Sequence, residues 1–294
     1  MRVLILGGTG FIGPYVAKEL CLRNHEVTLF HRGAHETVLA PEARHFRSEK
    51  AAMPVVDFPE ELLRARFETV IHMIVMGECD ARAVVRAFTG RAKRLVVLSS
   101  GDVYRAYGRF TRIEPGPIEE GLLTEDSPLR SALFPYRAEA KSESDLSYFY
   151  EKILVEREVL AQPALPATVL RLPKVYGPGG NADLATVYRN RNYPPWRWTH
   201  GYVENVAAAI VLAALHPAAS GRVYNLGEAY TPTIAERLKS LPASSVPSVD
   251  DNYDFRQNIA YDTTRIRREL GYEEPVNDDE ALRRTLGLAR VHNV

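Results

Sequence analysis

The chain has 294 residues, and its 37 Lys and Arg residues balance 37 Asp and Glu residues, so the formal net charge is zero. A nucleic acid or a membrane surface is therefore not expected as the main partner, because neither would attract the protein over long range. The hydrophobic content of 46% is that of a globular protein, and the length suits one large or two modest domains. Two cysteines without C-x-x-C spacing fit a reducing cytoplasm, and no metal site is predicted.

The beginning of the chain predicts a dinucleotide site. An apolar run over 3–6 predicts a buried strand, an amphipathic helix follows from about residue 15, and Gly7, Gly10 and Gly13 lie between them. Gly7 lets the chain leave the strand, Gly10 lets the backbone approach a pyrophosphate, and Gly13 lets the helix pack closely on the strand. The helix N-terminus offers N–H groups and a positive dipole end to phosphates. The residues expected to bind the cofactor are Gly7, Thr9, Gly10, Phe11, Ile12 and Gly13; a tight turn without a ligand is the alternative.

The second predicted strand, 26–30, leads into His31, Arg32 and Gly33. In NAD-specific proteins with such a glycine-rich turn, an acidic residue near this point binds the hydroxyls of the adenosine ribose. Arg32 stands there instead, and a guanidinium suits a 2′-phosphate. The sequence therefore favours NADP over NAD, with a solvated loop arginine as the alternative.

The remaining elements alternate between strands and helices. Strands are predicted over 45–47, 69–74, 94–100, 167–172 and 221–226, and helices over 57–66, 80–88, 144–158, 203–215, 233–241 and 281–290. This alternation predicts an α/β fold of the Rossmann type, a doubly wound parallel sheet with ligands at the carboxyl ends of its strands. Ser99 and Ser100 lie at such an end, and His72 is expected to be a hydrogen-bonded core histidine.

Two parts of the chain are predicted. A dinucleotide-binding Rossmann domain would span 1–175, with 199–226 returning to it, and a small C-terminal substrate lobe would comprise 176–198 and 227–294. Turn signals within 105–147 predict an excursion from the sheet. The longest apolar stretch, 206–215, is far shorter than the ~20 residues that span a membrane, so a buried helix is expected there.

Five motifs, taken together and in this order, resemble those of the extended short-chain dehydrogenase/reductases, the sugar-nucleotide epimerase/dehydratase proteins. They are the glycine-rich turn 7–13, the run from Leu98 to Tyr104, Tyr148-x-x-x-Lys152, the run from Arg171 to Pro178 and the run from Gly201 to Ala207. The resemblance implies a cofactor of the NAD(P) type and a small-molecule substrate, which could be a sugar nucleotide.

The resemblance also implies roles for individual residues. Tyr148 would be the catalytic acid/base, and the ammonium of Lys152 would favour its phenolate and hold the nicotinamide ribose. Ser100 would hydrogen-bond the substrate oxygen, and Pro173 would contact the cofactor. Two other tyrosines are less favoured, because Lys141 is five residues from Tyr136 and a leucine lies one helical turn after Tyr150.

The sequence departs from the family pattern at several points. The gap from Ser100 to the expected Tyr148 is longer than in the family, and Gly101 and Asp102 replace the Asp-Glu pair of the dehydratases. Lys174 replaces an asparagine that often contacts the nucleotide sugar. The residues expected to contact substrate are Asp102, Lys174 and Arg256, although both cations could instead face solvent.

These departures shape the expected function. The segment 181–198 and the tail are short and leave little material to enclose a full nucleotide sugar, and Trp196 and Trp198 could line a pocket or pack internally. An NAD(P)-dependent oxidoreductase or epimerase acting at a hydroxyl or carbonyl carbon is expected, with dehydration disfavoured by Gly101. A non-catalytic NADP(H)-binding sensor or RNA-associated protein on the same fold is the alternative. A homodimer formed through the helices near 80–90 and 144–158 is also open.

Overall fold

The computed structural model describes residues 1–33, 40–48, 53–182, 184–249 and 252–288. Within these residues a seven-stranded parallel sheet has the order β3-β2-β1-β4-β5-β6-β9. Its strands are β1 (Arg2–Leu6), β2 (Glu26–His31), β3 (Arg44–Arg47), β4 (Phe67–His72), β5 (Ala92–Ser100), β6 (Ala167–Leu172) and β9 (Val223–Asn225). The predicted doubly wound parallel sheet is thus confirmed, and its order reverses between β1 and β4, where a crevice for ligands is expected.

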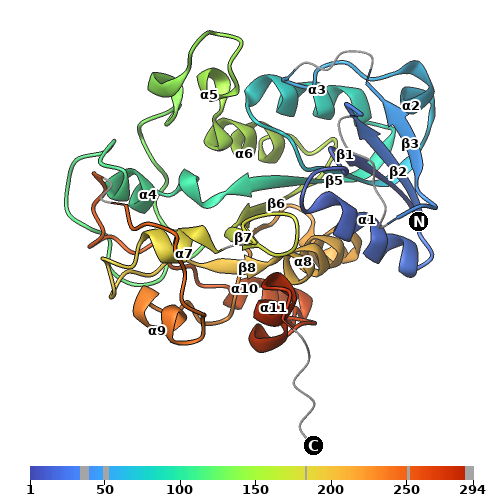
Figure 1. The fold of residues 1–294 in the computed structure, drawn as a ribbon. Helices are drawn as coiled ribbons and strands as arrows, with labels where there is room; N and C mark the ends of the chain where they lie inside the picture. The colour runs from blue at the N-terminus through green and yellow to red at the C-terminus, as the bar shows by residue number, and fades with distance from the viewer. Residues whose placement is uncertain (34–39, 49–52, 183, 250–251, 289–294) are drawn as a thin grey trace, which may run out of the picture.

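Helices cover both faces of the sheet (Figure 1). One face carries α1 (Gly13–Leu22) and α8 (Val203–Leu215), and the other carries α2 (Glu60–Arg64), α3 (Glu78–Phe88) and α6 (Lys152–Leu160). No helix among the described residues is long and apolar enough to cross a lipid bilayer.

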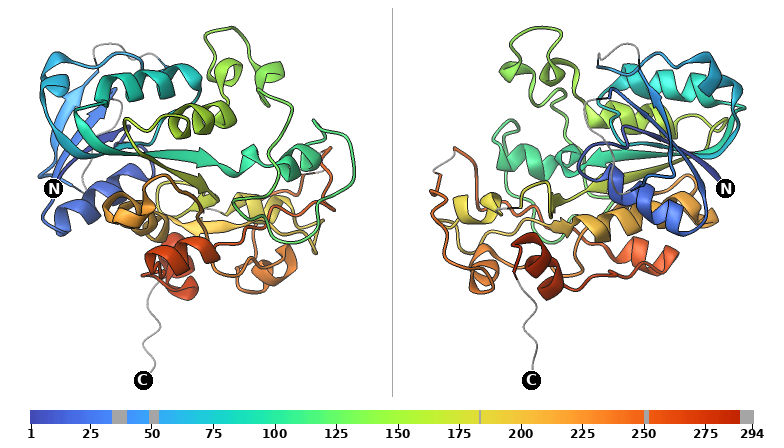
Figure 2. Two further views of the ribbon diagram at one scale, coloured as in Figure 1. Left: turned by 180° about the vertical axis from the view of Figure 1, so that it is seen from behind. Right: turned by 45° about the vertical axis from the view of Figure 1, so that its right-hand side comes forward.

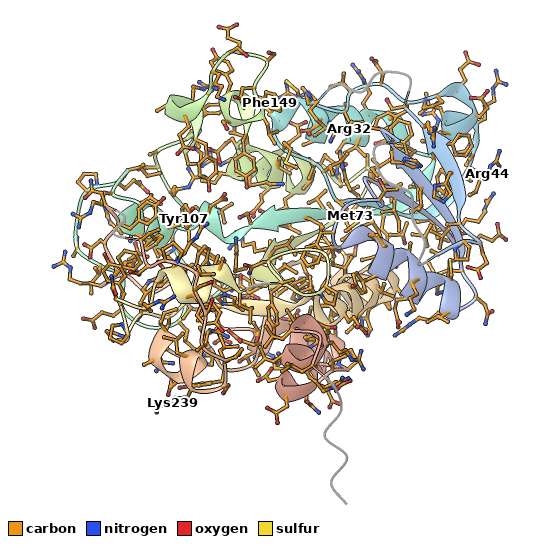
Figure 3. All side chains as sticks on the ribbon, viewed as in Figure 1. Arg32, Arg44, Met73, Tyr107, Phe149 and Lys239 are labelled. Carbon is orange, nitrogen blue, oxygen red and sulfur yellow. The ribbon has the colours of Figure 1, made fainter. Side chains whose placement is uncertain are left out.

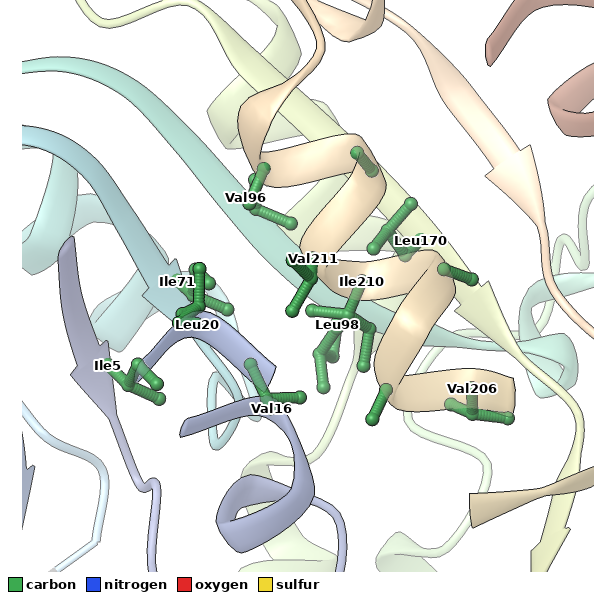
Figure 4. Packing of buried hydrophobic residues seen from close by; sticks show 14 of the residues in the cluster. Ile5, Val16, Leu20, Ile71, Val96, Leu98, Leu170, Val206, Ile210 and Val211 are labelled. Carbon is green, nitrogen blue, oxygen red and sulfur yellow. The ribbon is translucent and has the colours of Figure 1, made fainter. Parts of the chain in front are cut away.

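The core explains why these segments fold as they do. The side chains of β1 from Val3 to Leu6 are all buried, as expected for a central parallel strand covered on both faces. In Figure 4, Val206 and Ile210 of α8 pack toward Leu98 of β5 and Leu170 of β6. Helix α8 has the bounds that the sequence predicts. Most of its side chains are apolar and buried, which is why the apolar run of the sequence marks the helix well.

A second, two-stranded parallel sheet joins β7 (Lys174–Tyr176) to β8 (His200–Tyr202) beyond the carboxyl edge of the main sheet. Figure 2 shows the helices of the C-terminal part gathered around it, and they are α7 (Ala185–Arg189), α9 (Ile234–Lys239), α10 (Thr264–Leu270) and α11 (Asp278–Thr285). The helix predicted over 281–290 begins earlier, and residues 289 and 290 lie outside the described residues. The division into a Rossmann domain and a substrate lobe stays a prediction.

The single helix predicted over 144–158 is wrong. The chain forms the short α5 (Leu146–Phe149), becomes extended at Tyr150 and Glu151, and only then begins α6 at Lys152. The cause is Glu151, whose buried carboxylate forms an ion pair with Arg130 at 3.2 Å and also caps α6 by accepting from the N–H of Ile153 at 2.9 Å. Its backbone N–H donates to the carbonyl of Met76 at 2.8 Å, so the chain cannot remain helical there.

The excursion over 105–147 contains α4 (Arg105–Phe110) and a 3₁₀ turn, η2 (Arg137–Glu139). The guanidinium of Arg137 lies 3.5 Å from the ring centre of Phe134 and 4.7 Å from that of Tyr148. Its Nε donates to the backbone carbonyl of Tyr148 at 2.8 Å. Arg137 therefore fastens the end of the excursion to α5.

Candidate active site

The glycine-rich turn joins β1 to α1 and has the shape that a phosphate group needs. A Cβ on Gly13 would lie 2.4 Å from the carbonyl oxygen of Gly8, so only glycine permits this close packing. A Cβ on Gly10 would meet nothing within 4 Å, which leaves open space above the turn. No side chain caps the N-terminus of α1. Pro14 has no N–H and the N–H of Tyr15 donates to the carbonyl of Ile12 at 3.1 Å, so an anion would have to be bound by the N–H groups of the turn before Pro14 and by the positive end of the helix dipole. These residues fit the pyrophosphate of a dinucleotide.

Two arginines lie at the carboxyl end of β2. Arg32 follows this strand and is exposed (Figure 3). Arg47 ends the neighbouring β3 in register with His31, and a Cβ on Gly33 would lie 3.3 Å from its side chain. The sequence did not single out Arg47, because the register of the two strands is needed to bring it close to Gly33, the residue after Arg32.

A cavity of about 400 Å³ lies beside the carboxyl ends of β5 and β6. Its lining residues are Ser100, Gly101, Asp102, Tyr107, Tyr136, Leu146, Ser147, Tyr150, Leu172, Pro173, Lys174, Trp198, Ile259 and Tyr261. The cavity therefore brings together five residues singled out from the sequence, namely Ser100, Asp102, Pro173, Lys174 and Trp198.

Two residues expected in the site lie elsewhere. Tyr148 does not line this cavity, and its hydroxyl donates to Glu143 at 3.2 Å. The expected face shared by Tyr148 and Lys152 does not exist, because the helix is interrupted between them. The Arg256 side chain is 79% exposed and pairs with Asp254 at 2.6 Å.

Asp102 is the centre of the cavity's hydrogen bonds. The hydroxyls of Tyr150 and Tyr136 donate to its Oδ2 at 2.8 and 3.0 Å, and the Tyr136 hydroxyl also lies 3.2 Å from that of Tyr107. The other carboxylate oxygen, Oδ1, is buried without a hydrogen-bond partner among the described residues. Burial raises the pKa of Asp102, and the bonds from the two tyrosines oppose this shift.

Tyr150 stands where three polar groups meet. Its hydroxyl bonds to Asp102 and to the side chain of Ser100, and the ammonium of Lys152 lies 5.5 Å from its ring centre. Burial and the charge of Asp102 raise the pKa of Tyr150 well above its usual value. A phenol in this environment holds its proton until a strong acceptor approaches.

Lys152 points into the protein rather than into solvent. Its Nζ donates to the backbone carbonyls of Leu98, at 3.0 Å, and of Val75. Burial lowers the pKa of Lys152 to about 8, although the nearby carboxylates of Asp102 and Asp80 act in the opposite direction. Lys152 is thus held beneath Tyr150 at the carboxyl end of β5.

The predicted hydrogen-bonded state of His72 is wrong. This histidine is fully buried at the end of β4, and neither ring nitrogen has a partner among the described residues. Burial and the charge of Lys152 lower the pKa of His72 to about 3, so the ring is neutral.

Gly101 faces Tyr261 across the cavity wall. A Cβ on Gly101 would lie 1.3 Å from the Tyr261 hydroxyl oxygen, so no residue with a side chain fits without displacing that ring. The acidic residue that dehydratases of the resembling family carry at this position is therefore excluded by the fold as well as missing from the sequence.

The two tryptophans have different roles. Trp196 is 1% exposed and stacks on Phe110 with a centroid distance of 5.0 Å, so it packs internally. Trp198 lines the cavity, and the ammonium of Lys174 lies 5.6 Å from its ring. Burial and the nearby Arg189 lower the pKa of Lys174.

The sequence analysis assigned none of the three tyrosines around Asp102 to the site. Tyr107 was not considered, and Tyr136 was set aside because Lys141 is five residues away; both belong to the excursion, whose path follows no hydrophobic period. Tyr150 was set aside because a continuous helix would place a leucine, not a lysine, on its face. Glu151 caps the new helix in the structure, but nothing in the sequence signals it, because glutamate is not among the usual N-cap residues.

Comparison with solved structures supports the fold. The chain is 18% identical to UDP-glucose 4-epimerase from Thermotoga maritima, over 98% of both chains, with a TM-score of 0.70. It is 16% identical to dTDP-glucose 4,6-dehydratase from Bacillus anthracis, over 98% of this chain and 96% of that one, with a TM-score of 0.71. A short-chain dehydrogenase/reductase superfamily protein from Agrobacterium tumefaciens with bound NAD is 20% identical, over 98% and 96% of the two chains, with a TM-score of 0.65.

Sequence comparison identifies the family. A search of curated proteins gave no match. The sequence model of the NAD dependent epimerase/dehydratase family, however, matches residues 3–227, which include the glycine-rich turn and most of the cavity. The chain therefore belongs to the NAD dependent epimerase/dehydratase family.

Proposed function

We propose that the protein is an NAD(P)-dependent oxidoreductase or epimerase that acts at a hydroxyl or carbonyl carbon of a sugar-like substrate. The observation that carries this proposal is the meeting of Ser100, Tyr150 and Asp102 in one cavity, with Lys152 beneath them. The cavity lies at the carboxyl ends of β5 and β6, on the sheet edge where ligands of such folds bind.

Tyr150, rather than Tyr148, is proposed as the group that moves the substrate's proton. In oxidation, the substrate hydroxyl gives its proton to the Tyr150 oxygen, while Tyr150 passes its own proton to Oδ2 of Asp102, 2.8 Å away. The raised pKa of Asp102 favours acceptance of that proton. Reduction runs the same transfers in reverse, and Ser100 holds the substrate oxygen beside Tyr150.

The cofactor would lie between the glycine-rich turn and the cavity. Gly7, Thr9, Gly10, Phe11, Ile12 and Gly13 would hold the pyrophosphate, and Pro173, which lines the cavity, would contact the nicotinamide half. Lys152 does not line the cavity, so it would act through Tyr150 rather than on the nicotinamide ribose. When bound, the nicotinamide supplies or accepts the hydride. Arg32, with Arg47 close to the adjacent Gly33, favours a 2′-phosphate and hence NADP over NAD.

Oxidoreduction or epimerisation is preferred over dehydration. Elimination of water needs an acid and a base on neighbouring atoms of the substrate. Asp102 can supply one of them, but Gly101 supplies none, and Tyr261 fills the space that a side chain there would need.

The proposal is tested by comparing Tyr150→Phe with Tyr148→Phe for NADPH consumption across a panel of sugar-derived carbonyl compounds. Tyr150→Phe should lower kcat by about 10²–10⁴-fold, the usual contribution of a positioned acid/base. Tyr148→Phe should retain activity within a few-fold, because its hydroxyl bonds only to exposed Glu143. The reverse ranking would refute the role of Tyr150. Cofactor binding with no turnover by any variant would favour the non-catalytic sensor.

A further inference from the structure

Only two of the cavity's lining side chains carry a formal charge, and they have opposite signs. Asp102 offers the oxygen Oδ1, which is buried and has no hydrogen-bond partner among the described residues. The hydroxyls of Tyr150 and Tyr136 cover its other oxygen, Oδ2, so a ligand hydroxyl in the cavity would meet Asp102 through Tyr150.

Lys174 is the second charged group, and its charge is not balanced within the described residues. Arg189, a second cation, is the only charged group that shifts the pKa of Lys174, and no carboxylate contributes. The Lys174 ammonium instead lies 5.6 Å from the ring of Trp198. A partly buried ammonium with a cation for a neighbour is a suitable site for an anionic group.

The segment around β8 leaves little for a nucleobase to stack on. Tyr193 stacks on Phe255 with a centroid distance of 3.4 Å, and Trp196 is occupied by Phe110 at 5.0 Å. Trp198 is the ring of this segment that lines the cavity, and the Lys174 ammonium lies over it. The rings of Tyr193, Trp196 and Trp198 thus already contact other side chains of the protein, which leaves little aromatic surface in this segment for a nucleobase.

We propose that the substrate is a small anionic sugar derivative, a sugar acid or a sugar phosphate, rather than a nucleotide sugar. One hydroxyl bonds to Tyr150 and Ser100 at the cavity wall, and the anionic group pairs with Lys174. This inference rests on the proposed function for the identity of the site, but it concerns binding and can be tested without turnover.

The test is calorimetric titration of the NADPH-saturated protein with glucose, gluconate, glucose 6-phosphate and UDP-glucose. Gluconate or glucose 6-phosphate should bind at least about tenfold more tightly than glucose, the gain expected for one charge-assisted hydrogen bond. If gluconate binds more tightly than glucose 6-phosphate, the substrate is a sugar acid; if glucose 6-phosphate binds more tightly, it is a sugar phosphate. UDP-glucose should bind no more tightly than the stronger one.

Variants assign the effect to Lys174. Lys174→Met should remove the preference for the anionic probe over glucose, whereas Lys174→Arg should retain it. Lys239→Met is the matched control, since Lys239 is an exposed lysine on α9, well separated from Tyr107 of the cavity (Figure 3).

Two results would overturn the proposal. One is that neither gluconate nor glucose 6-phosphate binds more tightly than glucose. The other is that UDP-glucose binds far more tightly than both, which would show that a nucleotide is recognised. Both results come from binding measurements and do not depend on catalysis. They can therefore be distinguished from a kinetic result that refutes the role of Tyr150.

Discussion

The close approach of Gly101 and Tyr261 allows the cost of one added methyl group to be predicted. In Gly101→Ala the new Cβ would lie 1.3 Å from the Tyr261 hydroxyl oxygen and 2.4 Å from the ring carbon that bears it. The ring is buried beside Tyr104, at a centroid distance of 5.9 Å, so it cannot swing into solvent. Overpacking costs typically 1–3 kcal/mol, and overlap with a rigid ring should bring the loss to about 3 kcal/mol.

The assays are urea unfolding, which gives the free energy of unfolding, and thermal unfolding, which gives Tm, both followed by circular dichroism. Gly10→Ala is the control because its Cβ would meet nothing within 4 Å. Gly101→Ala should lower Tm by roughly 6–12 °C, at about 2–4 °C per kcal/mol for a chain somewhat smaller than this one. In a Tyr261→Leu background the clashing atoms are gone, so the same substitution should cost less than about 1 kcal/mol. If the two substitutions add within about 0.5 kcal/mol, the proposed steric conflict is refuted.

Three further predictions concern charged groups. Arg32→Ala should weaken NADPH binding about tenfold and leave NADH binding within twofold, because only NADPH carries the 2′-phosphate; equal losses in fluorescence titrations would contradict this. Burial lowers the pKa of Lys152 to about 8 from 10.5, so between these pH values the unfolded chain binds a proton that the folded protein has lost. Stability should therefore rise with pH in this window relative to Lys152→Met, by at most about 1.4 kcal/mol per pH unit in urea unfolding, and a parallel pH profile would disprove it. Arg130→Met should cost about 3–5 kcal/mol, because it leaves the buried Glu151 carboxylate unpaired; additional replacement of Glu151 by leucine should restore most of that loss.

The sheet was predictable because its order follows from local patterns. A fully apolar run such as Val3–Leu6 requires cover on both faces, and alternating helices supply that cover. The interrupted helix before Lys152 was not predictable in this way. Its cause is a pair formed with Arg130, 21 residues earlier in the chain, and such a contact overrides local helix propensity.

In the candidate site, too, residues placed by local sequence patterns were predictable and residues placed by tertiary contacts were not. Ser100, Asp102 and Lys174 could be anticipated in one cavity because they follow strands or motifs whose ends meet at one edge of the fold. Tyr107 and Tyr136 could not, because an excursion without periodicity gives no register from which to place a side chain. The continuous helix implied by the spacing of Tyr148 and Lys152 is wrong for a related reason, since tertiary contacts break it, while the role of Tyr148 stays a prediction.

Asp102 lies just after a central strand, whereas Tyr136 reaches it from 34 residues further along the chain. The sheet is complete without the excursion that carries Tyr136, and that excursion is fastened to α5 by Arg137. Local opening of a protein involves its least stable contacts first, and segments outside the central sheet open at lower free energy than the strands. We therefore expect amide exchange near Tyr136 to be faster than in β5. The Asp102 carboxylate would then be exposed to water whenever this peripheral segment opens, even while the central sheet stays folded.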